Sequence, residues 1–316
     1  MKARLGMTKG GLKGILGLAL VLSLGLPILL PSLFSEDPMR EISLPSARQV
    51  QAPAADGDSD PTLKVLSLNI AHGRSDAWHQ LLLKTTTIEA NLERIGSLLQ
   101  RLSPDVVALQ EADGPSFWSG GFDHVARLGE LAGLPFGVGG EHVKMLGLGY
   151  GASLLSATPL TDPRSETFPL SLPTFPKGYV EAKVSMVGPD GVPKDVRVVS
   201  VHLDFASRRV RARQVGVMVE ALSKVEGPLI VMGDFNGDFS VGGPPRLMAE
   251  AMDMTVFEPF GEGMGTFPSF DSRLDWILIS QDLEFRSYEV IPDVVSDHLG
   301  VMAEVGWADG GFVGGD

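Results

Sequence analysis

Five short apolar runs in this sequence each end on side chains that can bind metal or phosphate. The central run, 229–232, is closed by Gly233 and followed by Asp234 and Asn236. Short β-branched runs that stop at glycine or polar residues are typical of buried strands. Because ligands in layered α/β folds gather where strand ends converge, we expect the five endings to meet at one rim. The other four runs end on Asn69, on Glu111, on His202, and on Asp297 with His298.

Each ending has an ordinary structural explanation when it is taken alone. An Asp-x-Asn after a strand is more often a turn than a catalytic site, and Glu111 could cap the loop that follows it. Five such endings in one chain are difficult to explain as separate coincidences. A carboxylate oxygen at Glu111 suits a hard cation such as Mg²⁺. The pattern therefore favours one shared site.

The order of these motifs resembles the endonuclease/exonuclease/phosphatase superfamily. That superfamily includes DNase I-like nucleases, abasic-site endonucleases, bacterial sphingomyelinases and inositol-phosphate phosphatases. The likeness extends from about residue 64 to about residue 305 and does not choose among these branches. The motifs that carry it are Leu68-Asn69, Gln110-Glu111, His202-Leu203, Gly233-Asp234-Phe235-Asn236, Leu274-Asp275-Trp276-Ile277-Leu278 and Ser296-Asp297-His298.

The resemblance implies a DNase I-like α/β fold, a four-layer sandwich of two mainly antiparallel β-sheets flanked by helices. The local patterns agree with an alternation of strands and helices. Apolar residues at helical spacing predict a helix over 87–102, with Thr86 and Glu89 as a capping box. Residues 179–187 and 195–202 predict a hairpin around a Gly-Pro-Asp-Gly turn. Three further helices are expected, at about 122–131, from about 207, and at 245–252.

The resemblance also implies a metal site. Glu111, with Asn69 nearby, would hold Mg²⁺, with Mn²⁺ or Ca²⁺ as alternatives, and Asp297 would be a second metal ligand. A zinc site is disfavoured, because the six histidines show neither His-Glu-x-x-His nor a short pair at ligand spacing.

The catalytic roles implied by the resemblance fall on five residues. His202 and Asn236 would donate hydrogen bonds to a phosphate. Asp275 would orient His298, since a carboxylate partner fixes the tautomer of an imidazole and favours its charged form. Either His298 or Asp234 would take the proton from water, and this choice stays open. The expected reaction is phosphoester hydrolysis, which requires an activated water and neutralised phosphoryl charge.

Four other histidines need an interpretation. His79, His124 and His142 are expected to be surface or core histidines with no part in catalysis. For His72 the two interpretations are nearly balanced, because it follows Asn69 in a loop at the expected rim.

The N-terminal region has the pattern of an export signal. Basic residues precede an apolar stretch from 15 to 34, about as long as a bilayer-spanning helix. We expect 1–34 to be a membrane anchor, or a signal sequence if it is cleaved, that places the rest outside the cytoplasm. A flexible linker, 35–61, would join it to the domain at 62–308, and 309–316 would be a flexible tail.

Composition narrows the substrate. The chain has no cysteine, which excludes thiol catalysis. Its formal charge is −13, and without the four basic residues of the leader it is about −17. This acidity disfavours long nucleic acid, for which phosphate neutralisation supplies most of the affinity. A phospholipid, sphingolipid or other small phosphodiester is therefore preferred.

Two alternatives remain. The first is a secreted or membrane-tethered nuclease, which would need a basic strip beside the site. Residues 208–213, with four arginines, are the candidate strip, although a solvated helix face is the preferred interpretation of them. Against the nuclease, the loop after the middle strand has Phe168 where abasic endonucleases have a tyrosine. The second alternative is a module that binds a phosphate-bearing ligand without catalysis. The oligomeric state is left open.

Overall fold

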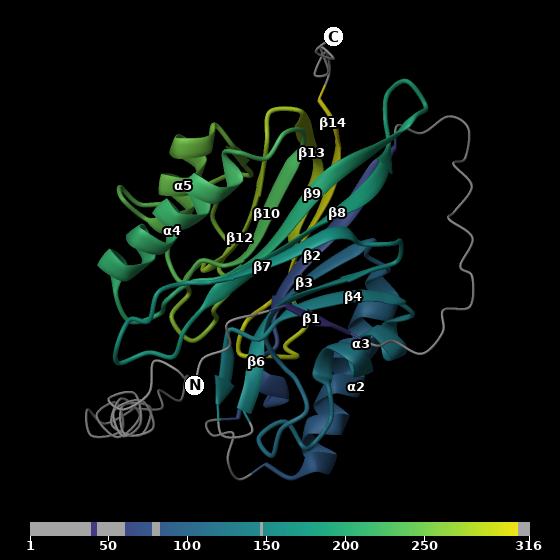
Figure 1. The fold of residues 1–316 in the computed structure, drawn as a ribbon, viewed down its shortest axis with the longest axis vertical. Coiled ribbons are helices and arrows are strands. Elements are labelled where there is room, and N and C mark those ends of the chain that lie inside the picture. The colour runs from purple at the N-terminus through teal and green to yellow at the C-terminus, as the bar shows by residue number, and fades with distance from the viewer. Residues whose placement is uncertain (1–38, 43–60, 78–82, 146–147, 309–316) are drawn as a thin grey trace, which may run out of the picture.

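A computed structural model describes residues 39–42, 61–77, 83–145 and 148–308 of this chain. Two β-sheets pack face to face, and helices cover the outer face of each (Figure 1). The first sheet comprises β1 (Met39–Glu41), β2 (Thr62–Asn69), β3 (Val106–Asp113), β4 (Phe136–Gly140), β5 (Val143–Met145), β6 (Leu148–Ser156), β13 (Leu283–Val290) and β14 (Val301–Trp307). The second comprises β7 (Thr161–Thr167), β8 (Gly178–Val187), β9 (Pro193–His202), β10 (Leu229–Asp234), β11 (Thr255–Val256) and β12 (Asp275–Ile279).

Both sheets are mixed but mainly antiparallel. The eight-stranded sheet has the order β1-β4-β6-β3-β2-β14-β13, with β5 also paired to β6, and only β2 and β3 run parallel among these pairs. The six-stranded sheet has the order β11-β12-β10-β9-β8-β7, with β9 and β10 parallel. The expected four-layer α/β sandwich is therefore confirmed.

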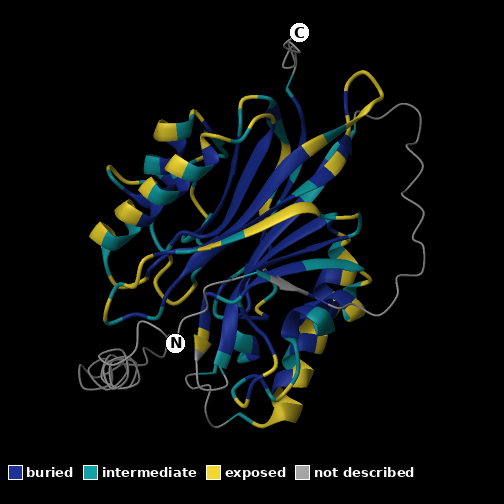
Figure 2. Ribbon diagram, in the orientation of Figure 1, coloured by how far each residue is buried: buried dark blue, intermediate teal, exposed yellow. Residues whose placement is uncertain are grey.

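Three apolar layers hold the sandwich together, and Figure 2 shows buried residues along the strands of both sheets. Side chains alternate between the faces of a strand. Along β2, Val65 packs into the layer between the sheets, whereas Leu66 and Leu68 pack toward the outer helices. The helices are α2 (Thr85–Leu102) and α3 (His124–Ala132) on the first sheet, α4 (Arg208–Leu222) and α5 (Pro244–Met252) on the second, and the short 3₁₀ helix η2 (Ala71–Gly73).

Strand directions bring many strand ends to one edge of the sandwich, which we call the site rim. In the first sheet β2 and β3 end there and β14 begins there, since Asn69 pairs in parallel with Gln110 and β14 runs antiparallel to β2. In the second sheet β9 and β10 end there, and β8 and β12 begin there. The rim is therefore where residues from both sheets can meet.

Two local predictions were wrong. The helix α2 begins at Thr85 with Lys84 as its N-cap and without a side-chain cap, so Thr86 lies inside the helix and forms no capping box. Residues 294–298 form a loop between β13 and β14 and not a strand. Val295 is buried against the α2 layer, so its burial resembles that of a strand although no neighbouring strand pairs with it.

The expected linker at 35–61 also contains ordered structure. Met39–Glu41 forms β1 and pairs antiparallel with β4 at the edge of the first sheet. This strand could not be predicted from the sequence, because three residues are too few to show a periodicity. Its pairing depends on backbone hydrogen bonds to an edge strand that is distant in the sequence. The predicted leader at 1–34 and tail at 309–316 lie outside the described residues. Within the described residues, no helix combines the length and the apolar character needed to cross a membrane.

His142 occupies a polar niche between the sheets. Space for its ring exists because a Cβ at Gly140, Gly151 or Gly178 would collide with the imidazole. Its Nδ1 accepts from the backbone N–H of Ala152 at 3.4 Å, and its Nε2 lies 3.2 Å from Ser165 Oγ. Protonation of Nδ1 would therefore place a hydrogen on His142 directly against the hydrogen of the Ala152 N–H. Burial lowers the pKa of His142 to about 3.

We expect His142 to make the fold sensitive to acid. The folded state keeps the ring neutral, whereas the unfolded chain binds a proton near pH 6.5, so stability falls as the pH drops from 6.5 toward 3. The loss should approach about 1.4 kcal/mol per pH unit. Denaturant unfolding between pH 7 and 4 should show a shallower dependence for His142→Gln than for the unmodified chain. Equal slopes would contradict a neutral buried imidazole.

Candidate active site

The candidate site is divided between the two sheets. Asn69 ends β2 in the first sheet, and Asp234 ends β10 in the second. Asn69 Nδ2 donates to Asp234 Oδ2 at 3.1 Å, and both side chains are buried. Asn69 Oδ1 accepts from the Ala71 N–H at 3.0 Å, which fixes the orientation of the amide. Packing of the two sheets therefore assembles the site.

Asp234 is at the centre of the cluster. Gly233 precedes it with a φ of +150°, and a Cβ at Gly233 would collide with the carbonyl oxygen of Val201 on β9. Asp234 Oδ1 accepts from the Asn236 N–H at 2.8 Å. Burial raises the pKa of Asp234 to about 7, and this outweighs the attraction of the His298 charge. The carboxyl group is thus poised to exchange a proton near neutral pH.

His298 is held by a buried carboxylate. Its Nδ1 lies 2.8 Å from Asp275 Oδ2, and the same oxygen accepts from Thr266 Oγ1 at 2.7 Å. Its other nitrogen, Nε2, points toward Asp234 Oδ2 at 3.9 Å. Although burial opposes the charge of His298, Asp275 and Asp234 raise its pKa to about 10. The imidazole is therefore a fixed cation at neutral pH.

Glu111 has an unusual backbone. Its φ is +52°, and the register of β3 against β6 shifts between Leu109 and Ala112. A left-handed glutamate is a strained conformation of the kind that functional sites retain. Its carboxylate lies 3.2 Å from His72 Nε2 and 3.9 Å from His202 Nε2. Burial alone would raise the pKa of Glu111, but His72, Lys177 and His202 hold it well below its usual range.

His72 belongs to the site. The sequence had not decided between this role and that of an ordinary surface or core histidine. His72 Nδ1 lies 2.7 Å from Asp113 Oδ1 while its Nε2 faces Glu111. The rings of Trp118 and Tyr150 approach it edge-on, with centroids 5.2 and 4.8 Å away. Burial disfavours the charged form, yet Asp113 and Glu111 raise the pKa of His72. Asp113 was missed, although it lies two residues beyond Glu111 in the same strand.

Lys177 is the second residue that sequence reasoning missed. It precedes Gly178, which pairs with His202 across β8 and β9, and its Nζ lies 3.4 Å from His202 Nδ1. Only 8% of Lys177 is exposed. An ammonium group has no acceptor, so this contact makes His202 Nδ1 the acceptor and leaves the proton on Nε2. Burial and the charge of Lys177 both lower the pKa of His202. A lone lysine in a loop carries no signal in the sequence.

His202 Nε2 consequently points its N–H into the cluster. It lies 3.5 Å from Asp234 Oδ2, the same oxygen that His298 Nε2 faces. Two imidazoles, one neutral and one cationic, therefore converge on a single carboxylate oxygen.

Two predicted site residues make other contacts. Asn236, with a φ of +49°, donates from Nδ2 to the carbonyl of Leu203 at 2.9 Å and so ties the loop after β10 to the end of β9. Asp297 pairs with Arg74 at 2.6 Å. The structure brings Asn69, Glu111, His202, Asp234, Asp275 and His298 together, whereas Asp297 would have to leave Arg74 to bind a metal.

The donor set fits a hard divalent cation. Glu111 is ionised and is the most accessible of the clustered carboxylates, with 19% of its side chain exposed. Asn69 Oδ1 keeps a lone pair beyond the one that Ala71 uses. Asp234, Asp275 and His298 also present atoms within 4.8 Å of one another, but His298 Nδ1 and Asp275 Oδ2 are committed to each other. Oxygen ligands at Glu111 and Asn69 suit Mg²⁺ better.

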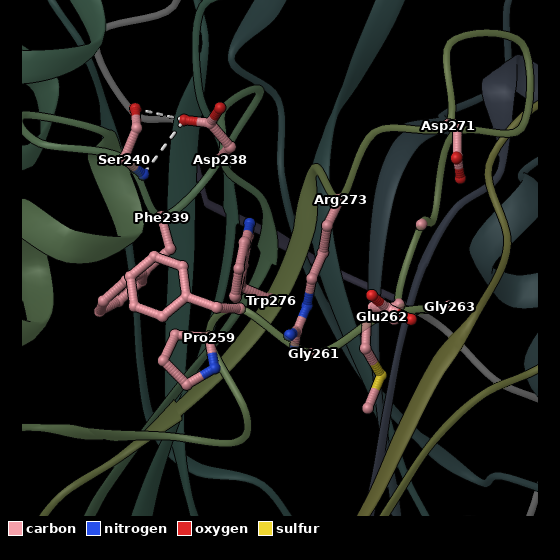
Figure 3. Close-up of a pocket in the computed structure, with 13 residues that line it drawn as sticks. Asp238, Phe239, Ser240, Pro259, Gly261, Glu262, Gly263, Asp271, Arg273 and Trp276 are labelled. Carbon is pink, nitrogen blue, oxygen red and sulfur yellow. Dashed lines mark hydrogen bonds between the residues drawn. The ribbon is translucent and has the colours of Figure 1, made fainter.

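A pocket of about 550 Å³ lies against the start of β12 (Figure 3). Its walls come from the loop after β10 and the segments before β12, and include Phe239, Phe260 and Trp276. The Arg273 guanidinium stacks over Trp276 at 3.9 Å. None of the residues predicted from the sequence lines it, yet Trp276 directly follows Asp275 on β12.

We expect Lys177→Met to change the protonation of His202 without unfolding the chain. Removing the ammonium group should raise the pKa of His202 and release its Nδ1 from the acceptor role, since the charge of Lys177 lowers that pKa. Histidine ¹⁵N NMR as a function of pH would report both effects. Lys183→Met is the matched control, because Lys183 lies on β8, the strand that Lys177 precedes, but pairs with Asp195 at 3.4 Å. An unchanged His202 titration in Lys177→Met would contradict the contact.

Comparisons with known proteins identify the family and the fold. A model of the endonuclease/exonuclease/phosphatase family matches residues 66–298. No curated protein sequence matches the chain.

Solved structures share the fold at low identity. A Bacteroides vulgatus endonuclease/exonuclease/phosphatase has a TM-score of 0.60 at 18% identity, covering 78% of this chain and 99% of its own. A Beutenbergia cavernae endonuclease/exonuclease/phosphatase has a TM-score of 0.57 at 20% identity, covering 78% and 72%. The Bacteroides thetaiotaomicron mannosyl-6-phosphatase has a TM-score of 0.55 at 19% identity, covering 77% and 99%. At these identities the likeness shows the fold alone.

Proposed function

This chain belongs to the endonuclease/exonuclease/phosphatase family of phosphoesterases and nucleases, and from that premise we propose that it is a Mg²⁺-dependent phosphodiesterase. Its substrate would be a phospholipid, sphingolipid or other small phosphodiester outside the cytoplasm, with the chain tethered to a membrane by residues 15–34 or secreted if the leader is cleaved. The observation that carries the proposal is the convergence of His202 and His298 on one oxygen of Asp234.

The residues divide the work of hydrolysis. Bound through Glu111 and Asn69, Mg²⁺ would neutralise charge on a phosphate oxygen. Asp234, with a pKa near 7, accepts a proton from the attacking water. His298 stays cationic and stabilises negative charge that develops on the phosphoryl group. His202 donates its Nε2–H to a phosphate oxygen, an orientation that Lys177 enforces.

Two observations bear on the alternatives. A nuclease needs free basic groups beside the site, but Arg208 donates to the carbonyls of Val241 and Gly242, and Arg211 to those of Asp204 and Phe205. These two arginines brace loops of the rim, which leaves only the exposed Arg209 and Arg213 for a basic strip and so disfavours DNA. A module without catalysis would not need an assembled cluster, whereas Glu111 lies within 3.9 Å of His202. Both observations favour a small-substrate enzyme.

Hydrolysis of bis(p-nitrophenyl) phosphate by the full-length chain in detergent tests the proposal. We expect turnover with Mg²⁺ that EDTA abolishes. Glu111→Ala and His298→Ala should each lower kcat by about 10²- to 10⁴-fold, because each removes a group at the rim and leaves the core layers intact. Glu89→Ala, on the exposed face of α2, is the control and should keep full activity.

Circular dichroism of each variant would separate loss of chemistry from loss of folding. A folded, Mg²⁺-loaded chain that hydrolyses no phosphodiester would overturn the proposal. A panel of phosphatidylcholine, sphingomyelin and DNA then distinguishes the lipid substrate from the nuclease alternative.

A further inference from the structure

Exposed apolar side chains concentrate at one end of the molecule. Among the described residues, ten large hydrophobic side chains are exposed, and eight lie in connections that meet at the site rim. The other two, Val187 and Val192, flank the turn of the β8–β9 hairpin. In Figure 1 this hairpin projects at the upper right, away from the rim. The eight are Phe117, Leu170, Leu172, Phe205, Val241, Phe260, Phe270 and Val294.

The chain order places each of the eight beside a strand end that carries the site. Phe117 follows β3, which holds Glu111. Leu170 and Leu172 precede β8, and Phe205 follows β9 and His202. Val241 follows β10 and Asp234. These side chains therefore lie in several independent loops at the site rim.

The remaining three lie in two further loops, and that of Val294 is held against α2 by Arg94. Phe260 and Phe270 lie between β11 and β12, and Val294 lies between β13 and β14. Phe270 stacks on Phe267, whose ring contacts His298 at a centroid distance of 4.9 Å. Exposed apolar side chains that gather in one region mark an interaction surface for a protein or a membrane. Aromatic and aliphatic side chains of this kind enter the interfacial layer of a bilayer.

The N-terminal chain reaches the domain at this same rim. Strand β1 starts at Met39, which pairs with Gly140 at the end of β4. Strand β4 runs antiparallel to β6, and β6 antiparallel to β3, so Gly140 lies at the end of its strand nearest Glu111. The apolar segment 15–34 thus ends a few residues before the chain arrives at the rim. A segment of that length suits a bilayer.

We propose that the site rim faces a lipid bilayer of neutral surface charge, with segment 15–34 held in that bilayer and the rim's apolar side chains seated in its interfacial layer. The formal charge of −13 opposes an anionic surface. The inference rests on the proposed function, because a site turned toward a bilayer takes a phosphodiester that the bilayer presents. It also explains why so much apolar surface borders a polar, ionic cluster.

Fluorescent probes at single cysteines test the orientation, since the chain has no cysteine of its own. Full-length Phe117→Cys and Phe205→Cys chains would carry an environment-sensitive fluorophore and be reconstituted into phosphatidylcholine vesicles. Val192→Cys is the matched control, because Val192 is similarly exposed, at 56% against 60% for Phe205, but lies at the opposite end. A nitroxide attached to the lipid chains should quench the two rim probes by about twofold or more and leave the Val192 probe unchanged.

Equal quenching at both ends, or quenching of the rim probes by aqueous iodide alone, would overturn the proposal. So would a full-length chain that fails to float with the vesicles.

A kinetic arm separates this inference from the proposed function. The Phe117→Ser/Phe205→Ser chain should keep its turnover of soluble bis(p-nitrophenyl) phosphate, because neither side chain contacts the cluster. Its turnover of phosphatidylcholine or sphingomyelin in vesicles should fall about tenfold. Equal turnover of the vesicle lipid by both chains would contradict the inference. Failure of the unmodified chain on every phosphodiester would instead refute the function, and the probe experiment would still decide the orientation.

Discussion

The hydrogen bond from Asn69 to Asp234 is the contact on which the rest of the site depends, because it crosses from one sheet to the other. It does not act alone. Gln110 on β3 donates to Ser200 on β9 at 3.2 Å, and Ser200 in turn donates to the carbonyl of Leu109 at 3.1 Å. These polar bridges lie beneath the site, in the mainly apolar layer between the sheets. Buried polar groups that are satisfied in only one arrangement fix how two surfaces pack. The apolar residues stabilise the association of the sheets, and the bridges set its register.

Charge within the cluster is balanced over many groups. Glu111, Asp113, Asp234 and Asp275 are opposed by Lys177 and by two histidines, His72 and His298, whose pKa values are raised. Each imidazole keeps a distinct state because its second nitrogen has a distinct partner. A carboxylate makes His298 a cation, whereas an ammonium group makes His202 a neutral donor. Histidine therefore serves in this site both as a cation and as a neutral hydrogen-bond donor, and the partner of its second nitrogen decides which.

The site residues that could be predicted from the sequence are those that lie at the ends of strands. The runs ending at Asn69, Glu111, His202 and Asp234 are strands, and the motif order identified the fold. What it could not predict depends on contacts between distant segments. Lys177 enters the site because β8 pairs with β9, and β1 forms because an edge strand about 100 positions away offers hydrogen bonds. The prediction of a strand at 294–298 was wrong because Val295 is buried in a loop, and burial of an apolar residue does not require a strand.

The position of β14 has a consequence for biosynthesis. This strand lies between the edge strand β13 and β2, so the sheet that carries Asn69 and Glu111 is joined to its edge by the strand that comes last in chain order. As a nascent chain emerges from its N-terminus, β2 keeps an unpaired edge until residues 301–307 arrive. His298, only three positions earlier, is delivered by the same segment. The chemistry therefore cannot begin before residues 298–307 have been synthesised, and a product truncated before them has an open β-edge that chaperones or proteases can bind.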